Sequence, residues 1–393
     1  MSKKNIAVIF GGVSVEHDVS ILTAQQTMNA IDTTKFNIIP VYISLQGEWF
    51  CDDVLRNKEF FKDKSKIKEL PEVWITPFRN DSNLYSDKKG FGGLLKGKTK
   101  IPFDIAFPLV HGSNGEDGTL QGIFDLKNIP YVGSNTLSSS LCMNKYLTKQ
   151  IMNQISIHVL PCTYVEMDEW YHNEKEVVEL FEKEYSYPVI VKPNSLGSSI
   201  GVKGVNNREE LGVAVDNAFK IDTALLIEPM IIDMMEINCA VLDGKEKIIS
   251  RTEQPLSGGK LLDFSTKYMK GGKVKKLGTQ NRSSTSSRGM EDTPRIIPAP
   301  CDPGIIKKVE GYSLNAFEAM GCSGVVRIDY IFDVKEDRLY LNELNTIPGS
   351  LAYYLFKDLD IDFTDLTTLL LENAVRVYGL KNRKTFNYNS GLF

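Results

Sequence analysis

A lysine at the end of an apolar run, followed by a loop of small residues, is the first feature that could carry chemistry. The run PVIVK ends at Lys192, and the segment after it, PNSLGSSIGVKG, contains Ser198 and Ser199. Glycines let backbone N–H groups approach an anion closely, hydroxyls add donors, and a lysine adds a fixed positive charge. We expect a phosphate-binding loop, with a triphosphate as its ligand. The segment is not a Walker A sequence, and an ordinary glycine turn is the alternative.

Oxygen-bearing side chains gather in two apolar runs nearer the C-terminus. The runs are GVVRIDYIF, with Asp329, and LYLNELNTIPGS, with Glu343 and Asn345. If they pair as strands, the three side chains converge, and Glu343 and Asn345 share a face because residues two apart on a strand point the same way. Carboxylate and amide oxygens without histidine or cysteine suit Mg²⁺ held together with nucleotide phosphates. A cross-strand polar cluster around Arg327 is the alternative.

Two further segments place glycines and then acidic or histidine side chains after an apolar run. They are FGGVSVEHDVS, with Glu16 and His17, and FPLVHGSNGEDGTLQG, with His111. Ligands of open α/β sheets bind beyond the carboxyl ends of the strands, so both segments are expected to line one crevice. A lone histidine is more often a hydrogen-bonded structural group, and a helix N-terminus would also explain an acidic residue at position 16.

The elements that must position these residues begin with an α/β module at residues 1–138. Alternating strand and helix patterns predict a parallel sheet there. The predicted elements are strands at 5–10, 36–43 and 103–109 and a helix at 19–31. Residues 46–102 are lysine-rich and irregular, so we expect peripheral hairpins or loops.

Two more modules follow, at residues 139–228 and 229–393. The first is predicted to contain helices at 140–154 and 175–185, a strand that ends at Pro161, and strands at 188–192 and 224–228. The second is rich in strands, with predicted strands at 236–242, 246–251, 324–333 and 338–343 and a closing helix at 363–378. Residues 271–292 combine glycine, serine and like charges without an apolar period, which predicts a mobile loop spanning about 260–292.

Composition excludes several classes of protein. The 393 residues carry 46 Lys and Arg against 50 Asp and Glu, a formal net charge of −4, so no overall positive field favours nucleic acid or an anionic membrane. No run approaches the roughly 18 apolar residues of a membrane span, and the apolar run at the start is too short for a signal peptide. The six cysteines lack a C-x-x-C pair. We therefore expect a cytoplasmic protein with reduced thiols.

Taken together, FGGVSVEHDVS, HGSNGEDGTLQG, VKPNSLGSSIGV, RIDY and NELNTIPG stand in the order seen in D-alanine-D-alanine ligases. From residue 4 to about residue 375 the chain resembles this family of the ATP-grasp superfamily. The resemblance implies an α/β protein with an ATP-grasp fold preceded by a Rossmann-like parallel-sheet domain. It also implies the reaction. The carboxylate of one D-alanine attacks the γ-phosphate of ATP, and the amine of a second D-alanine displaces phosphate from the acyl phosphate.

The same resemblance implies which residues contact the phosphates. Lys145, in LCMNKYLTK, and Lys192 resemble the family's phosphate-binding lysines. The loop with Ser198 and Ser199 would close over the γ-phosphate. Lys267, in LLDFSTKY, would reach phosphate from the flexible loop.

For the remainder of the nucleotide, the resemblance implies contacts from the segment EPMIIDMMEI. Glu228 would lie in the hinge beside adenine, and Glu236 would accept hydrogen bonds from the ribose hydroxyls. Asp329, Glu343 and Asn345 match the family's metal ligands. Two Mg²⁺ or Mn²⁺ ions are implied, with the carboxylates shared between them.

On the amino-acid side, Glu16 would hold the ammonium group of the first D-alanine, with His111 beside it. Arg327 and the Gly349 amide would stabilise charge on the transferring or acyl-phosphate oxygens. Tyr268 would hydrogen-bond with Glu16 and with the serine of the phosphate loop. A tyrosine at this position favours an amine acceptor, most simply D-alanine, because relatives that accept D-lactate lack it.

The chain departs from the family's pattern at several positions. Asn144 replaces a common aspartate, and the EPMIIDMMEI hinge lacks the usual glycine-arginine. Tyr353 and Tyr354 stand where relatives often have small or histidine side chains that hold the second substrate. A ligase for D-serine, D-lactate or another acceptor is therefore an alternative, as is a nucleotide-binding regulatory protein without catalysis. We also expect a homodimer. The segments with Arg288 and Arg295 have two alternatives, folding over the site or solvation, and we expect solvation.

Overall fold

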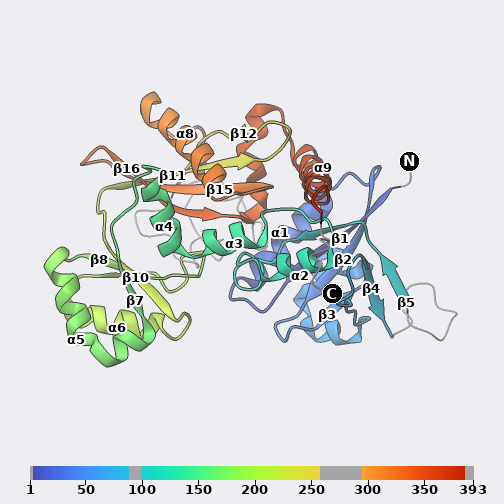
Figure 1. The fold of residues 1–393 in the computed structure, drawn as a ribbon, viewed down its shortest axis with the longest axis horizontal. Coiled ribbons are helices and arrows are strands. Elements are labelled where there is room, and N and C mark those ends of the chain that lie inside the picture. The colour runs from blue at the N-terminus through green and yellow to red at the C-terminus, as the bar shows by residue number, and fades with distance from the viewer. Residues whose placement is uncertain (1–2, 88–98, 257–293, 386–393) are drawn as a thin grey trace, which may run out of the picture.

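The structure is a computed structural model that describes residues 3–87, 99–256 and 294–385. It confirms a mixed α/β architecture with one mainly parallel sheet and several antiparallel sheets. Figure 1 shows the N-terminal sheet at one end, a smaller lobe at the other, and the C-terminal strands and helices along the top. Lys267, Tyr268 and the loop predicted at 260–292 lie outside the described residues.

The N-terminal sheet has the strand order β3-β2-β1-β6, and β1 pairs in parallel with β2 and with β6. Its central strand is buried on both faces, which is why it reads as a continuous apolar run. The sheet and its helices comprise β1 (Lys4–Gly11), α1 (His17–Ala30), β2 (Phe36–Ile43), β3 (Trp49–Cys51), β6 (Ile105–Pro108) and α2 (Thr119–Lys127).

The prediction of peripheral hairpins or loops at residues 46–102 is wrong in part, because β3 is a strand of the N-terminal sheet and Leu55 and Leu84 are fully buried. Short 3₁₀ turns begin after Asp52, Asn57 and Asp63, whose side chains each accept a backbone N–H hydrogen bond. The strands β4 (Asn83–Ser86) and β5 (Thr99–Pro102) pair in antiparallel fashion.

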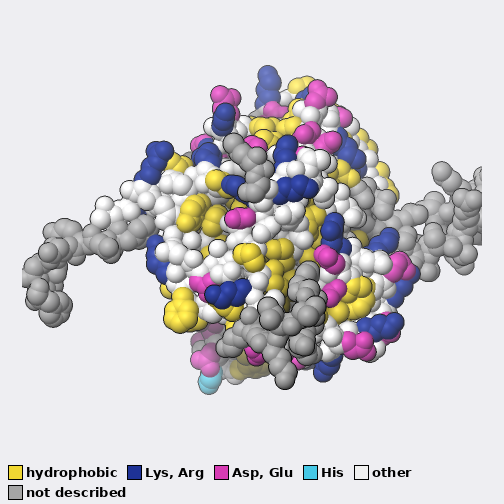
Figure 2. Space-filling view, turned by 90° about the vertical axis from the view of Figure 1, so that its right-hand side faces the viewer, with side chains coloured by type: hydrophobic (Ala, Val, Ile, Leu, Met, Phe, Trp, Pro, Cys, Tyr) yellow, Lys and Arg dark blue, Asp and Glu magenta, His cyan; other side chains and the backbone are white. Residues whose placement is uncertain are grey.

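On the face drawn in Figure 2, acidic and basic side chains are intermixed around small hydrophobic patches.

The smaller, central lobe is an antiparallel sheet of order β7-β10-β8-β9 covered by two helices. Its elements are β7 (Thr163–Glu166), α5 (Met167–Glu184), β8 (Val189–Pro193), β9 (Lys203–Val205), α6 (Arg208–Ala218) and β10 (Ala224–Pro229). The strand predicted to end at Pro161 is wrong: β7 begins at Thr163, and Val159 instead forms an isolated bridge with Leu341. Proline has no N–H to donate within a sheet.

The helix predicted at 140–154 is two helices, α3 (Thr136–Met143) and α4 (Lys145–Gln154). Asn144 separates them, because its side chain accepts a hydrogen bond from the Leu147 amide and caps α4. The cap therefore fixes the start of the helix that carries Lys145.

The C-terminal lobe has an antiparallel sheet of order β12-β11-β15-β16. Its elements are β11 (Met234–Leu242), β12 (Ile248–Ile249), β13 (Gln254–Pro255), β14 (Arg295–Ile296), α8 (Pro303–Ala319), β15 (Val325–Asp333), β16 (Arg338–Asn345) and α9 (Phe363–Lys381). Helix α8 is a finding of the structure, since the sequence patterns had not indicated it. The strand predicted at 246–251 is only the two-residue β12.

One hydrophobic cluster joins the N-terminal sheet to the C-terminal segment. Phe10 of β1, Leu355 of the 3₁₀ turn Gly349–Leu355 and Leu370 of α9 all belong to it. The two ends of the chain therefore share a core, which holds the residues after β16 against the N-terminal domain. None of the helices in the described ranges is long and apolar enough to cross a membrane.

Candidate active site

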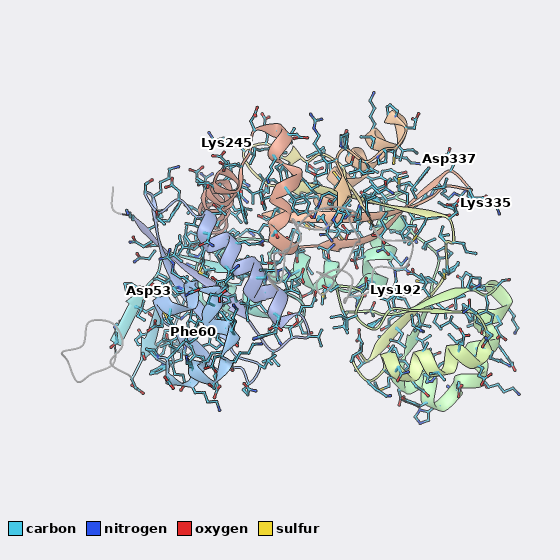
Figure 3. The ribbon with its side chains drawn as sticks, turned by 180° about the vertical axis from the view of Figure 1, so that it is seen from behind. Asp53, Phe60, Lys192, Lys245, Lys335 and Asp337 are labelled. Atoms are coloured by element: carbon cyan, nitrogen blue, oxygen red, sulfur yellow. The ribbon has the colours of Figure 1, made fainter. Side chains whose placement is uncertain are left out.

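A cavity lies between the central-lobe sheet and the C-terminal sheet, and we call it the interlobe cavity. It is lined by residues from α4, the two lobes' strands and the loop after β8; the polar ones are Lys145, Lys192, Ser199, Glu228, Glu236, Asn238, Arg327, Asp329, Asn342 and Glu343. Figure 3 shows Lys192 at the side of the central lobe that faces the C-terminal strands. Both lysines and both serines predicted for phosphate binding are thus near one opening, with Ser198 in the neighbouring pocket described below.

The loop after β8 has a conformation that side chains seldom adopt. Ser198 and Ser199 have φ angles of 53° and 57°, in the left-handed region. Consecutive non-glycine residues there are unfavourable unless the surroundings hold them, and such geometry clusters at ligand sites. The loop is held at its start by Asp222, which accepts from the Ser195 amide at 2.7 Å.

Lys145 fixes the loop to helix α4. Its backbone N–H donates to the carbonyl of Asn194 at 3.1 Å, and its Nζ donates to the carbonyl of Leu196. Its Nζ also lies 3.7 Å from Oε2 of Glu343. The side chain therefore connects the loop with strand β16.

Glu228 lies in the cavity wall at the end of β10. Its carboxylate contacts Lys192 and also Lys149, a lysine that the sequence reading did not single out. The available signal was spacing, because Lys149 follows Lys145 by one helical turn on α4.

The predicted metal ligands lie on paired strands. Asp329 of β15 is directly opposite Glu343 of β16, and Arg327 is opposite Asn345. Arg327 donates to Asp329 from Nε at 2.6 Å and from Nη2 at 2.7 Å, and Nδ2 of Asn345 donates to Asp329 at 3.0 Å. Two carboxylates and one amide form a donor set that fits Mg²⁺ or Mn²⁺ when phosphate oxygens complete the coordination. Among the described residues, no group of three His, Cys, Asp or Glu side chains could hold a metal alone.

A second, smaller pocket adjoins the first where the N-terminal domain meets both lobes, and we call it the junction pocket. Its lining residues are Glu16, His111, Glu116, Gly197, Ser198, Arg327, Glu343, Asn345, Ile347, Pro348 and Gly349. Arg327 and Glu343 line both cavities. A group bound in one cavity is therefore next to a group bound in the other.

Glu16 closes the junction pocket on one side. The Ser198 hydroxyl donates to Oε1 of Glu16, which joins the phosphate-type loop to the N-terminal domain. A Cβ on Gly112 would lie 2.8 Å from the Glu16 carboxylate, and one on Gly197 would lie 3.1 Å away. A side chain at either position would therefore crowd the Glu16 carboxylate.

The two histidines of the glycine-rich segments differ. His111 lines the junction pocket, its Nε2 is 3.0 Å from the Thr23 hydroxyl, and burial, with Arg327 nearby, lowers its pKa to about 4. It is therefore neutral at pH 7. His17 contacts the Gly12 carbonyl at 2.7 Å and the Tyr42 hydroxyl at 2.9 Å. His17 has the structural role that its sequence context left open.

Family models match both parts of the chain. The "D-ala D-ala ligase N-terminus" model matches residues 5–134, and the "D-ala D-ala ligase C-terminus" model matches residues 151–372. The chain belongs to the D-alanine-D-alanine ligase family.

Relatives and solved structures agree with this assignment. The D-alanine–D-alanine ligase of Thermosipho melanesiensis is 37% identical over 99% of this chain and 98% of its own length. That of Staphylococcus epidermidis is 33% identical over 98% and 99%. The D-alanine-D-alanine ligase structure from Coxiella burnetii has a TM-score of 0.76, with 26% identity over 98% and 97% of the chains. The VanG D-Ala:D-Ser ligase from Enterococcus faecalis has a TM-score of 0.74, with 30% identity over 96% and 100%.

The structure of this family member brings one more acid into the junction pocket that the sequence reading missed. Oε2 of Glu116 accepts from the Gly112 amide at 2.8 Å, and Oε1 accepts from the Ile347 amide at 3.3 Å. Burial raises the pKa of Glu116 to about 8, and the negative charge of Glu16 adds to the shift. Its place in HGSNGEDG was the only signal in the sequence.

Arg295 is not solvated, so that expectation is wrong. Its guanidinium donates to Glu253 at 2.7 Å and lies 3.7 Å from the ring centroid of Tyr354. The β13–β14 pairing holds the arginine there, because Arg295 is opposite Pro255. Tyr354 is buried by this contact, and Tyr353 stacks on Phe363 at 4.2 Å.

Proposed function

We propose that this chain joins two D-alanine molecules to D-alanyl-D-alanine at the expense of ATP, through an acyl phosphate, for peptidoglycan precursor synthesis. The observation that carries the proposal is the shared wall of the two cavities. Arg327 and Glu343 line both, so a nucleotide in the interlobe cavity and an amino acid in the junction pocket would meet at these side chains. Membership of the ligase family supports the same reaction.

In the first step, a carboxylate oxygen of D-alanine forms a bond to the γ-phosphorus, and the bond to the β-phosphate oxygen breaks to release ADP. This transfer needs alignment and charge neutralisation more than a protein nucleophile. Lys145 and Lys192 would neutralise the phosphates, and the Ser198 loop would cover them. Lys267 would add a further cation. Glu16, with His111 and the newly found Glu116 around it, would hold the donor's ammonium group and so aim its carboxylate at the shared wall.

In the second step, the amine of the other D-alanine attacks the acyl carbon, and inorganic phosphate leaves with the carboxylate oxygen. Arg327 and the Gly349 amide line the junction pocket where negative charge develops on oxygen. Tyr268 would complete the hydrogen bonds to Glu16 and Ser198. Because His111 is neutral at pH 7, it carries no positive charge that would compete with the substrate's ammonium group for the Glu16 carboxylate.

The metal ions belong to the proposal as well. Asp329, Glu343 and Asn345 would hold Mg²⁺ or Mn²⁺, two ions in all, against the nucleotide. Metal bound there supplies charge neutralisation of the phosphate oxygens. Glu236, on β11 in the cavity wall, would accept from the ribose, and Glu228 would lie beside adenine.

D-Serine is the second candidate acceptor. The likeness to the VanG D-Ala:D-Ser ligase and the buried tyrosines after Gly349 favour testing it. Phosphate release should be measured with ATP, Mg²⁺ and D-alanine alone, and then with D-serine or D-lactate added. Release with D-alanine alone supports the first candidate, whereas release only in the presence of D-serine supports the second.

We further propose that the enzyme works in the cytoplasm as a homodimer. Its use of ATP and its free cysteines support the location. Light scattering coupled to size exclusion tests the dimer directly, since a monomer mass at assay concentration contradicts it.

A further inference from the structure

Three charged side chains form a buried row beside the interlobe cavity, with Lys192 and Glu228 in its wall and Lys149 behind them. Nζ of Lys149 lies 2.8 Å from Oε1 of Glu228, and Nζ of Lys192 lies 2.8 Å from Oε2. Lys149 and Glu228 are each 2% exposed, and Lys192 is 5% exposed. At this burial solvent screens the charges weakly, so each affects its neighbours strongly.

The row has one positive charge in excess. One carboxylate is shared by two ammonium groups, those of Lys149 and Lys192. An excess charge in a buried place is costly unless an opposite charge faces it. The described lining of the cavity holds three basic and four acidic side chains: Lys145, Lys192, Arg327, Glu228, Glu236, Asp329 and Glu343. Their formal net charge is negative, which disfavours an anion. Lys149, behind the wall, supplies a further positive charge.

Lys149 does not line the cavity and so must act through Glu228. Besides its ion contact with the carboxylate, its Nζ donates a hydrogen bond to the Leu160 carbonyl at 2.8 Å. Burial lowers the pKa of Lys149, and the Glu228 carboxylate opposes that shift. For Glu228, burial favours the neutral form, but Lys192 and Lys149 together hold its pKa below the ordinary value. The ion contacts therefore keep the row charged.

We propose that Lys149 is a positioning residue for the nucleotide, which it serves by occupying one oxygen of Glu228. The carboxylate then holds Lys192 through its other oxygen alone, and the charge of Lys192 stays directed at phosphate. Asn342 accepts from Lys192 at 3.2 Å, and Oε2 of Glu228 pairs with the same ammonium group at 2.8 Å. An ammonium group has three donors, so Lys192 would still donate to a phosphate oxygen. This inference rests on the proposed function, in which the cavity binds ATP.

The test is a double-mutant cycle on nucleotide affinity. The dissociation constant of Mg·ADP is measured by calorimetry for the full chain, for Lys149→Met, for Glu228→Gln and for the double variant. With Glu228 present, loss of Lys149 lets the carboxylate neutralise Lys192, and the dissociation constant should rise by about tenfold or more. In the Glu228→Gln background the same change should cost less than about threefold, because no carboxylate remains to act on Lys192.

Two further variants keep the test decisive. Lys149→Gln removes the charge but retains a donor for Glu228 and Leu160, so it carries the cycle if Lys149→Met does not fold. Lys127→Met is the matched control, since Lys127 is equally buried but donates to the Phe78 carbonyl in the N-terminal domain. Its thermal stability should fall while its Mg·ADP affinity stays within about twofold of the parent.

The outcomes separate the two proposals. If the parent protein does not bind Mg·ADP, the proposed function fails. If the parent binds but both Lys149 variants bind equally well, or lose the same factor with and without Glu228, the role of Lys149 is wrong.

Discussion

Arg327 grips Asp329 with two parallel hydrogen bonds, 2.6 Å and 2.7 Å long, between side chains two residues apart on β15. The arginine also lines the junction pocket, while Asp329 lines the interlobe cavity. The pair therefore lies where the two proposed half-sites meet, and metal bound to Asp329 would change how tightly Arg327 is held. In the proposed reaction, charge on the carboxylate and charge on the substrate would compete for the same guanidinium.

Arg327→Ala should reduce kcat by about 10²–10³-fold or more, because a donor aimed at developing negative charge is lost. The circular dichroism spectrum should remain that of the parent. Steady-state phosphate release checks the rate. A kcat within threefold of the parent would remove Arg327 from the proposed chemistry.

Glu343→Gln should weaken divalent-metal binding as well as turnover, since one shared carboxylate is lost from the proposed metal set. The Mg²⁺ concentration for half-maximal activity is expected to rise about tenfold or more, with Mn²⁺ giving partial recovery. Calorimetric titration of Mg²⁺ in the presence of ADP gives a readout independent of turnover. Unchanged metal affinity would argue against this ligand.

Ser198→Ala removes the hydrogen bond to Glu16 that joins the loop to the N-terminal domain. A hydrogen bond to a charged group is worth about 1.5–3 kcal/mol, so the KM for the donor D-alanine should rise about tenfold or more. Ser65→Ala, on an exposed turn, is the control and should leave KM as it is. Equal KM values for the Ser198 variant and the parent would mean that this contact does not shape the pocket.

Glu116 makes stability depend on pH in a predictable direction. Its folded pKa is about 8, above the ordinary value of 4.5, so the folded state keeps a proton that the unfolded state releases between these values. The contribution of Glu116 to the free energy of unfolding should be highest below pH 4.5 and should fall as the pH rises to about 8. Urea unfolding of the metal-free protein at several pH values measures this, and Glu116→Gln should flatten the dependence. A parent and a variant with parallel profiles would refute it.

The sequence predicted site residues whose contacts follow from local patterns, and it missed those whose partners are distant along the chain. That Asp329 and Glu343 face each other could be predicted, because two apolar runs indicate adjacent strands and the alternation of side chains along a strand is a local rule. Lys149 and Glu116 were missed because their partners, Glu228 and Ile347, lie far away along the chain and only the tertiary fold brings them near. The polar, glycine-rich segment before Arg295 predicts a solvated side chain, yet pairing across β13 and β14 places its guanidinium against Tyr354.

Element boundaries show the same division. Strands with continuous apolar runs, such as β2 at Phe36–Ile43, were predicted at their observed bounds. The single helix expected at 140–154 is divided because the Asn144 side chain accepts a backbone hydrogen bond at the start of α4. Such a side chain competes with the helix for backbone hydrogen bonds, and hydrophobic periodicity does not detect it. Helix α8 was missed although its buried residues Val309, Ser313 and Phe317 follow one another at helical spacing.

The fate of a labelled carboxylate oxygen shows whether ATP activates the carboxylate of D-alanine. The protein is incubated with ATP, Mg²⁺ and D-alanine that carries ¹⁸O in both carboxylate oxygens, and the products are analysed by mass spectrometry. If ATP activates the carboxylate as proposed, D-alanyl-D-alanine forms and each inorganic phosphate carries one ¹⁸O atom. Unlabelled phosphate, or phosphate release without the dipeptide, would contradict the account.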